Sequence, residues 1–270
     1  MRLPELGLLG RALLRARPDR RVHLERLAER LGDPGLVVAA AQAEVLHQLE
    51  ALVRPKLSVE VDGLSPGDTS AFVLQLSHVG HHGLAGPRLA RAGWPVWEVV
   101  LAPDALDHSL PSPSRLGQLS RRLVPPSEGV RRLAVGRYLG SAVRAASSGA
   151  VVVWPGDSAY GKKGIQSEFL GLPWFFPVGA ARCAQLARCP LRIGHVLRER
   201  VGRHRLCLGP PTPVEDAAGV ERATRAFIED LERVVRARPE LYLWRMATML
   251  AFGDGQGWRG GSSRIREVAP

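Results

Sequence analysis

The chain has 270 residues, which allows one large domain, and a net charge of +11; its 45% hydrophobic content and its lack of polar low-complexity tracts exclude bulk disorder. All but three of the 37 basic residues are arginines, so part of the charge reflects the base composition of the gene; the rest indicates an anionic membrane surface rather than nucleic acid, because no nucleic-acid motif and no interleaved aromatic residues accompany it. The three cysteines, Cys183, Cys189 and Cys207, lack metal-ligand spacing and are expected to be reduced thiols in a reducing compartment.

The N-terminal residues 1–54 are predicted to form a helical segment, with a break at the Asp-Pro-Gly of residues 33–35. Residues 1–17 lack the long apolar centre and the cleavage site of a signal peptide. Their Leu and Arg residues favour an amphipathic helix that lies in a membrane interface or packs on its own domain. No apolar run reaches about 18 residues, so no transmembrane helix is expected.

Strands and helices alternate in the following predicted domain, residues 55–252. Strands are expected at 57–63, 71–77, 96–101, 150–154 and 191–197 and around Leu206. Helices are expected at 84–92, 130–147, 178–188, 220–237 and 240–250, with irregular chain at 103–128 and a flexible tail at 253–270. Because several strands are apolar throughout, we predict an α/β fold with a mixed, largely parallel sheet flanked by helices.

His78 follows one of these buried strands, at the kind of junction where α/β proteins place reactive groups. A neutral imidazole there accepts a proton from a hydroxyl nucleophile, and Gly80 lets a substrate approach closely. A hydrogen-bonded structural histidine is the other interpretation. His78, His81 and His82 lie within five residues, but their loop spacing does not match a metal site, so we expect no metal.

Residues 76–96, from Leu-Ser-His-Val-Gly-His-His-Gly to Gly-Trp-Pro-Val, resemble the first motif of the bacterial lipid A biosynthesis (lauroyl/myristoyl) acyltransferases, members of the lysophospholipid acyltransferase superfamily. The residues in register are His78, Gly80, Leu84, Gly93, Pro95 and Val96. Weaker likenesses at 59–64, 149–158, 168–173 and 238–245 follow in the family's order, so the resemblance covers about residues 57–248.

The resemblance implies transfer of a fatty acyl group from an acyl carrier protein or coenzyme A thioester to a hydroxyl or amine of a lipid-like acceptor. It implies His78 as the general base and no cofactor besides the acyl thioester co-substrate. It also implies a cytoplasmic protein, peripheral on the inner face of the cell membrane, with no nucleic-acid partner. In the family an acid five positions after the histidine orients the imidazole.

That acid position is Gly83 here, which leaves three alternatives. Another acid moves beside His78 from a neighbouring strand end, the candidates being Asp157, Glu98 and Asp104. Alternatively, His78 works alone or with His82 on an activated thioester. In the third case catalysis is lost, and a degenerate homologue binds lipid or acylated carrier protein.

Candidate substrate-binding residues complete the prediction. Lys162 and Lys163 either bind a phosphate or form a solvated turn. Arg121, Arg122 and Arg137 lie where the family has a basic residue, and Arg122 is our candidate; Gly80 and His82 are the others beside His78. The aromatic residues 174–176 favour the core over the wall of an acyl groove, and Trp244 favours the core.

Overall fold

The computed structural model describes residues 3–53, 56–65, 70–100, 129–134, 138–157 and 163–253. The helices in these ranges are α1 (Leu3–Ala16), α2 (Pro18–Arg30), α3 (Leu36–Leu52), η2 (His82–Leu84), α4 (Ala85–Arg91), α7 (Tyr138–Ser147), α8 (Gly179–Ala187), α9 (Ala217–Ala237), η3 (Pro239–Leu241) and α10 (Leu243–Gly253). The strands are β1 (Ser58–Asp62), β2 (Val73–Gly80), β3 (Val96–Val100), β4 (Val130–Ala134), β5 (Val151–Pro155), β6 (Gly164–Phe169), β7 (Leu172–Pro177), β8 (Leu191–Arg200) and β9 (Arg203–Leu208).

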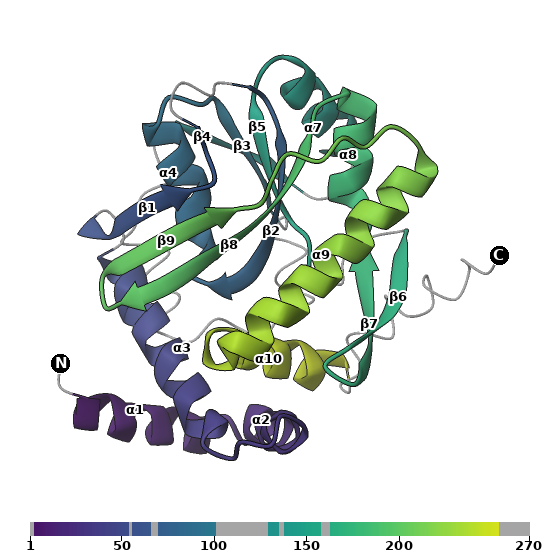
Figure 1. Ribbon diagram of the computed structural model, residues 1–270. Coiled ribbons are helices and arrows are strands. Elements are labelled where there is room, and N and C mark those ends of the chain that lie inside the picture. The colour runs from purple at the N-terminus through teal and green to yellow at the C-terminus, as the bar shows by residue number, and fades with distance from the viewer. Residues whose placement is uncertain are drawn as a thin grey trace.

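A seven-stranded sheet in the order β1-β9-β8-β2-β5-β3-β4 forms the centre of the molecule (Figure 1). The strands from β8 to β4 in that order are all parallel, whereas β9 is antiparallel to β8 and β1 is parallel to β9. The prediction of an α/β fold with a mixed, largely parallel sheet flanked by helices is therefore confirmed. β2 lies between β5 and β8, and this position decides which residues can meet at its end.

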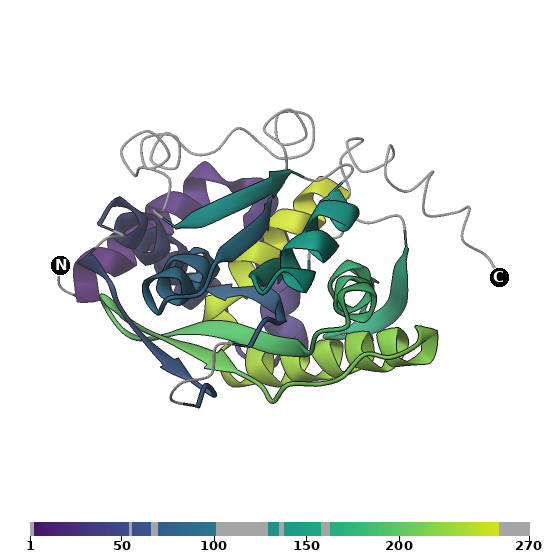
Figure 2. The ribbon, with the colours of Figure 1, turned by 90° about the horizontal axis from the view of Figure 1, so that it is seen from above.

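Helices cover both faces of the sheet, which is why the central strands are apolar throughout. Val73 and Val152 pack on one face in a cluster with α7, α8 and the start of α9, while Leu74 and Val153 pack on the other with α4. Full burial of each such side chain stabilises the fold by about 1.5–3 kcal/mol. The long helix α9 runs past the sheet in Figure 2.

The N-terminal helices share a third hydrophobic cluster with α9, α10 and the β6–β7 hairpin. Leu6 and Leu14 of α1 are buried, whereas Leu8 and Leu9 are exposed. Among the helices in the described ranges, none has the length and apolar character to cross a bilayer. The division into segments at residues 54 and 253 stays a prediction, and the predicted tail lies almost wholly in residues 254–270, outside the described ranges.

One expectation about secondary structure was wrong, and one element was not predicted. Residues 130–134 form β4 rather than the start of a helix, because pairing with β3 outweighs the helical preference of Arg, Leu and Ala. Residues 164–177, where the sequence indicated no strand, form the β6–β7 hairpin, and its Trp174 and Phe176 lie in the core, as expected for the aromatic residues. Leu170 and Gly171 between its strands both have positive φ, 51° and 75°, as a two-residue primed turn requires. Leu is uncommon at such a position, so the usual Asn-Gly signal was missing.

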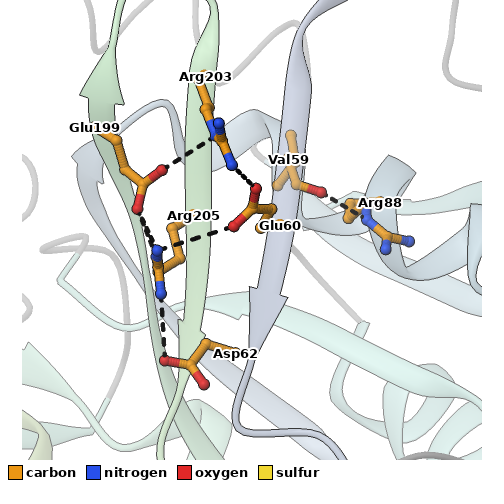
Figure 3. A network of polar contacts seen from close by, with 7 residues as sticks. All are labelled: Val59, Glu60, Asp62, Arg88, Glu199, Arg203 and Arg205. Carbon is orange, nitrogen blue, oxygen red and sulfur yellow. Dashed lines mark hydrogen bonds and ion pairs between the residues drawn. The ribbon is translucent and has the colours of Figure 1, made fainter.

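The exposed edge of the sheet carries a ladder of charges rather than apolar side chains (Figure 3). Arg205 of β9 forms ion pairs with Glu199 of β8 at 2.6 Å and with Glu60 of β1 at 3.9 Å. Arg203 also contacts both carboxylates, and Asp62 lies 4.0 Å from Arg205. Charged side chains on an edge strand oppose pairing with a second chain, so the ladder protects this edge.

A buried ion pair fastens α3 to the sheet. Glu50, 3% exposed, accepts hydrogen bonds from Arg198 Nε and from the Gly202 amide, each at 2.9 Å, and lies 3.4 Å from His204 Nε2. Burial alone raises the pKa of Glu50, but the hydrogen bond to His204 and the charge of Arg198 outweigh it and lower that pKa to about 2. The Glu50 carboxylate is therefore ionised throughout the neutral range.

Replacing Arg198 with Met is expected to lower the free energy of unfolding by about 3 kcal/mol at pH 7, because it leaves a buried carboxylate without its cation. Since the folded-state pKa of Glu50 lies below its ordinary 4.5, this contribution is complete above pH 4.5 and is lost as the pH falls toward 2. Urea denaturation at pH 7 and pH 3 measures both effects. The exposed pair of Arg236 and Glu232 gives the control, Arg236→Met, with a loss below about 1 kcal/mol; equal losses would contradict the assignment.

Candidate active site

His78 lies near the carboxyl end of β2, beside the end of β5. The Gly156 amide, directly after β5, donates to the Leu76 carbonyl at 2.8 Å and continues the contact between the two strands. A Cβ on Gly156 would come within 2.8 Å of the side chains of Gln75 and Phe227, so only glycine fits here. This close approach sets Asp157, the next residue, against the end of β2.

Both carboxylate oxygens of Asp157 contact His78. Oδ1 lies 2.5 Å from the ring Nδ1 of His78, and Oδ2 accepts the His78 backbone N–H at 2.8 Å. Asp157 is fully buried, whereas the His78 side chain keeps 13% of its surface exposed. An ionised carboxylate only accepts hydrogen bonds, so Nδ1 carries the proton and Nε2 presents a lone pair. The arrangement is that of an oriented general base.

The charge on Asp157 is maintained by its contacts with His78. Burial alone would raise the pKa of Asp157, but the charge of His78 and the two hydrogen bonds from His78 outweigh burial, so this pKa lies below its ordinary value. The carboxylate is therefore ionised at neutral pH. It can hold the imidazole in one tautomer and stabilise the imidazolium that forms when Nε2 accepts a proton.

Two further imidazole rings approach His78 from α3 and from the β2–α4 connection. The ring of His82 lies edge-on to that of His78, with centroids 4.4 Å apart, and His47 stacks over His82 at 6.3 Å. Burial, and then the charge of neighbouring basic groups, lowers the pKa of His82 well below its ordinary value and that of His47 to about 4. Both rings are neutral at pH 7. His82 Nδ1 has no hydrogen-bond partner among the described residues.

The C-terminal segment contributes two residues that the sequence did not single out as site residues. Tyr242 is fully buried, and burial together with the charge of Asp157 raises its pKa well above the ordinary value. The charge of Arg245 on α10 lowers the pKa of Asp157 and of His82. Both residues belong to the stretch 238–245 that resembles the family's C-terminal motif, which was the available signal. Trp244 lies in the core, as expected.

Glu98, a second candidate acid, does not join His78. The Glu98 carboxylate lies against Gly86 of α4, where a Cβ would come within 2.1 Å of its Oε1. Asp104 lies outside the described residues. Asp157 is therefore the described candidate that meets His78.

The remaining predicted residues are only partly described. Gly80 has φ of 58°, and a Cβ there would lie 2.1 Å from the Val196 carbonyl oxygen, so close packing against β8 requires this glycine. Lys163 is exposed at the start of β6. Lys162, Arg121, Arg122 and Arg137 lie outside the described residues. Within the described ranges, no three His, Cys, Asp or Glu side chains group as a metal ion would require.

Comparison with known proteins gives one family. The model of the bacterial lipid A biosynthesis acyltransferase family matches residues 114–247. This range contains Asp157 but begins after His78. The crystal structure of the 1-acyl-sn-glycerophosphate (LPA) acyltransferase PlsC from Thermotoga maritima superposes with a TM-score of 0.36 and 11% identity, over 86% of this chain and 97% of that one. No curated protein sequence matches the chain.

Proposed function

Because the chain belongs to the bacterial lipid A biosynthesis acyltransferase family, we propose that it transfers a fatty acyl group from an acyl carrier protein or coenzyme A thioester to a hydroxyl or amine of a lipid-like acceptor. His78 is the general base of this reaction, and Asp157 takes the place of the acid that Gly83 does not provide. The observation that carries the proposal is the 2.5 Å contact of Asp157 Oδ1 with His78 Nδ1.

In the proposed reaction, His78 Nε2 accepts the proton of the acceptor hydroxyl as its oxygen attacks the thioester carbonyl carbon. A carbon–oxygen bond forms, and the carbon–sulfur bond breaks as the tetrahedral intermediate collapses. The imidazolium then returns its proton to the leaving thiolate, which departs as free thiol. Asp157 stabilises the imidazolium between these two steps without taking the proton itself. The donor thioester and the acceptor hydroxyl account for all atoms and protons of the reaction.

The alternative of a degenerate binding protein rested on Gly83, where the family's acid is missing. A carboxylate from the end of β5 now stands at Nδ1 of His78 and gives the imidazole the orientation that the missing acid would provide. Among the described residues, this contact supports the enzyme proposal over the degenerate alternative.

We place the reaction at the inner face of the cell membrane, where a cytoplasmic thioester and a lipid acceptor meet. Helix α1 supports this part of the proposal, because it exposes Leu8 and Leu9 beside Arg11 and Arg15. Such a surface places apolar side chains among acyl chains and guanidinium groups among anionic headgroups.

The purified full chain is expected to release thiol from acyl coenzyme A or acylated carrier protein when vesicles of anionic phospholipid present a lysophospholipid or glycolipid acceptor. Thiol titration measures release, and mass spectrometry of the extracted lipid measures acyl transfer. Sedimentation of the same vesicles measures binding, which Leu8→Asp combined with Leu9→Asp is expected to weaken.

Each arm of this experiment decides a separate part of the proposal. Thiol release without an acylated lipid would replace the transferase by a thioesterase, and neither product with any donor or acceptor would contradict the enzyme proposal. Vesicle binding that is unchanged in the Leu8 and Leu9 variant would remove α1 from the membrane contact.

A further inference from the structure

The strand that carries His78 is irregular at that residue. Leu76 of β2 pairs with Gly194 of β8, whereas Gly80 pairs with Val196, so three residues of β2 stand opposite one residue of β8. The three are Ser77, His78 and Val79. Such a bulge interrupts the regular alternation of side chains, and bulges beside active sites change the direction in which a side chain points. His78 is the central residue of this bulge.

A chain of hydrogen bonds closes the bulge from the β8 side. The single opposing residue, His195, lies with Nδ1 at 2.6 Å from Ser77 Oγ and with Nε2 at 2.6 Å from Asp230 Oδ2 of α9. The Val79 amide donates to Ser77 Oγ at 3.3 Å. Ser77 and His195 are 1% and 4% exposed. These contacts connect helix α9 to both sides of His78 through one buried imidazole.

With a neutral His195 ring, one arrangement of protons satisfies every member of this set of hydrogen bonds. The Asp230 carboxylate accepts, so His195 Nε2 carries the hydrogen and Nδ1 is left as an acceptor. Ser77 then donates its hydroxyl proton to Nδ1 and keeps its lone pairs for the Val79 amide. The hydrogen bond from His195 is the largest of the effects that lower the pKa of Asp230 to about 2, so Asp230 is ionised at neutral pH.

The same three residue types act as a nucleophilic triad in hydrolases, but this geometry does not suit that role. In a hydrolase the serine contacts the imidazole Nε2 and the acid contacts Nδ1, whereas here the two are exchanged. Ser77 is also closed off from solvent, so no substrate carbonyl reaches its oxygen. The hydrogen bonds among Ser77, His195 and Asp230 therefore support the protein structure and do not act on a substrate.

We propose that Ser77, His195 and Asp230 are positioning residues, which hold the β2 bulge so that the next side chain, His78, meets Asp157. Two consecutive residues are thus fixed from opposite sides: Ser77 from β8 and α9, and His78 from the end of β5. The inference rests on the proposed function, in which His78 is the base. Misplacement of a base by about 1 Å slows the chemical step more than it weakens substrate binding.

Two variants interrupt the Ser77–His195–Asp230 hydrogen bonds at different points. Ser77→Ala removes the donor to His195, and Asp230→Asn removes the charge that fixes its tautomer. Each is expected to lower kcat by about 10- to 100-fold with KM changed less than about twofold. Thr224→Val deletes another buried hydroxyl hydrogen bond on α9, and Glu232→Gln neutralises a carboxylate two residues from Asp230; both controls are expected to retain wild-type kcat.

A proton NMR readout tests the inference without any turnover. The Nδ1 proton of His78 in its short contact with Asp157 is expected to give a low-field resonance, assigned by 15N-histidine labelling and by its loss in Asp157→Asn. Ser77→Ala and Asp230→Asn are expected to shift or broaden this resonance, whereas the two controls leave it in place. Asp230→Asn changes a partly exposed side chain, so it decides the question even if Ser77→Ala does not fold.

The outcomes separate the two proposals. Wild-type kcat in both chain variants, or a lowered kcat with an unchanged His78 resonance, would overturn the positioning role. Equal losses in the Thr224 and Glu232 controls would also overturn it, because any disturbance of α9 would then have the same effect. If the wild-type protein releases no thiol, the proposed function fails, and the resonance alone decides whether the chain positions His78.

Discussion

Replacing His78 with Ala is expected to abolish thiol release, with a fall in kcat of at least about 10³-fold, because no other described group takes the place of its Nε2 as proton acceptor. Asp157 acts only by orienting the His78 ring, so it cannot replace the lost base in this variant. The change is measured by thiol titration with saturating donor. Thermal unfolding followed by circular dichroism verifies that the variant is folded.

Added imidazole distinguishes a missing base from a disturbed fold. His78→Ala leaves a space beside Asp157 that free imidazole can occupy, so we expect the rate to rise with imidazole concentration and to saturate. The wild-type rate is expected to stay constant over the same range. A His78→Ala variant that is folded and keeps more than about a tenth of the wild-type kcat would remove His78 from the reaction.

Replacing Asp157 with Asn is expected to lower kcat by about 10²- to 10⁴-fold while KM stays nearly constant. The amide fills almost the same volume, but it no longer stabilises an imidazolium and it permits the wrong tautomer of His78. The same thiol assay measures both constants. Asp62→Asn makes the same chemical change in the exposed charge ladder of β1 and is expected to keep wild-type kinetics.

Restoring the family's acid at position 83 tests the same assignment from the other side. Because Asp157 already occupies the Nδ1 side of His78, Gly83→Glu in the wild-type background is expected to raise kcat by less than about twofold. A tenfold or larger increase would mean that His78 lacks an orienting acid in the native protein. Activity of Asp157→Asn within threefold of wild type would lead to the same conclusion.

The sequence singled out His78, the proposed base, but could not choose its acid. His78 was visible because a buried strand, a glycine and a family motif all meet there. Asp157 and Asp104 each follow a predicted strand and Glu98 lies within one, and the choice among them depends on strand order. Only the finding that β5 is next to β2, and that Gly156 packs closely, selects Asp157. Strand order is a property of tertiary structure that a single sequence does not express.

The three positioning residues, Ser77, His195 and Asp230, were harder still to recognise from the sequence. Ser77 resembles any small residue at the end of a strand, and His195 lies in the middle of a strand that mixes apolar and charged residues. Asp230 lies on an amphipathic helix among other acidic residues, so the sequence pattern indicates a solvated side chain. Each residue is ordinary alone, and their relation arises from a bulge that sequence periodicity does not predict. The β4 strand and the β6–β7 hairpin were missed for similar reasons, since long-range pairing and an unusual Leu-Gly turn decide both.

The proposed base, His78, and its acid, Asp157, are 79 residues apart in the chain; one lies in β2 and the other directly follows the end of β5. In the family's motif, by contrast, both come from one short stretch that can form locally. Here the proposed catalytic pair exists only once the central sheet has assembled, so recovery of activity during refolding should follow formation of long-range strand contacts rather than of helices. Enzymatic turnover would then serve as a sensitive reporter of complete folding in this protein.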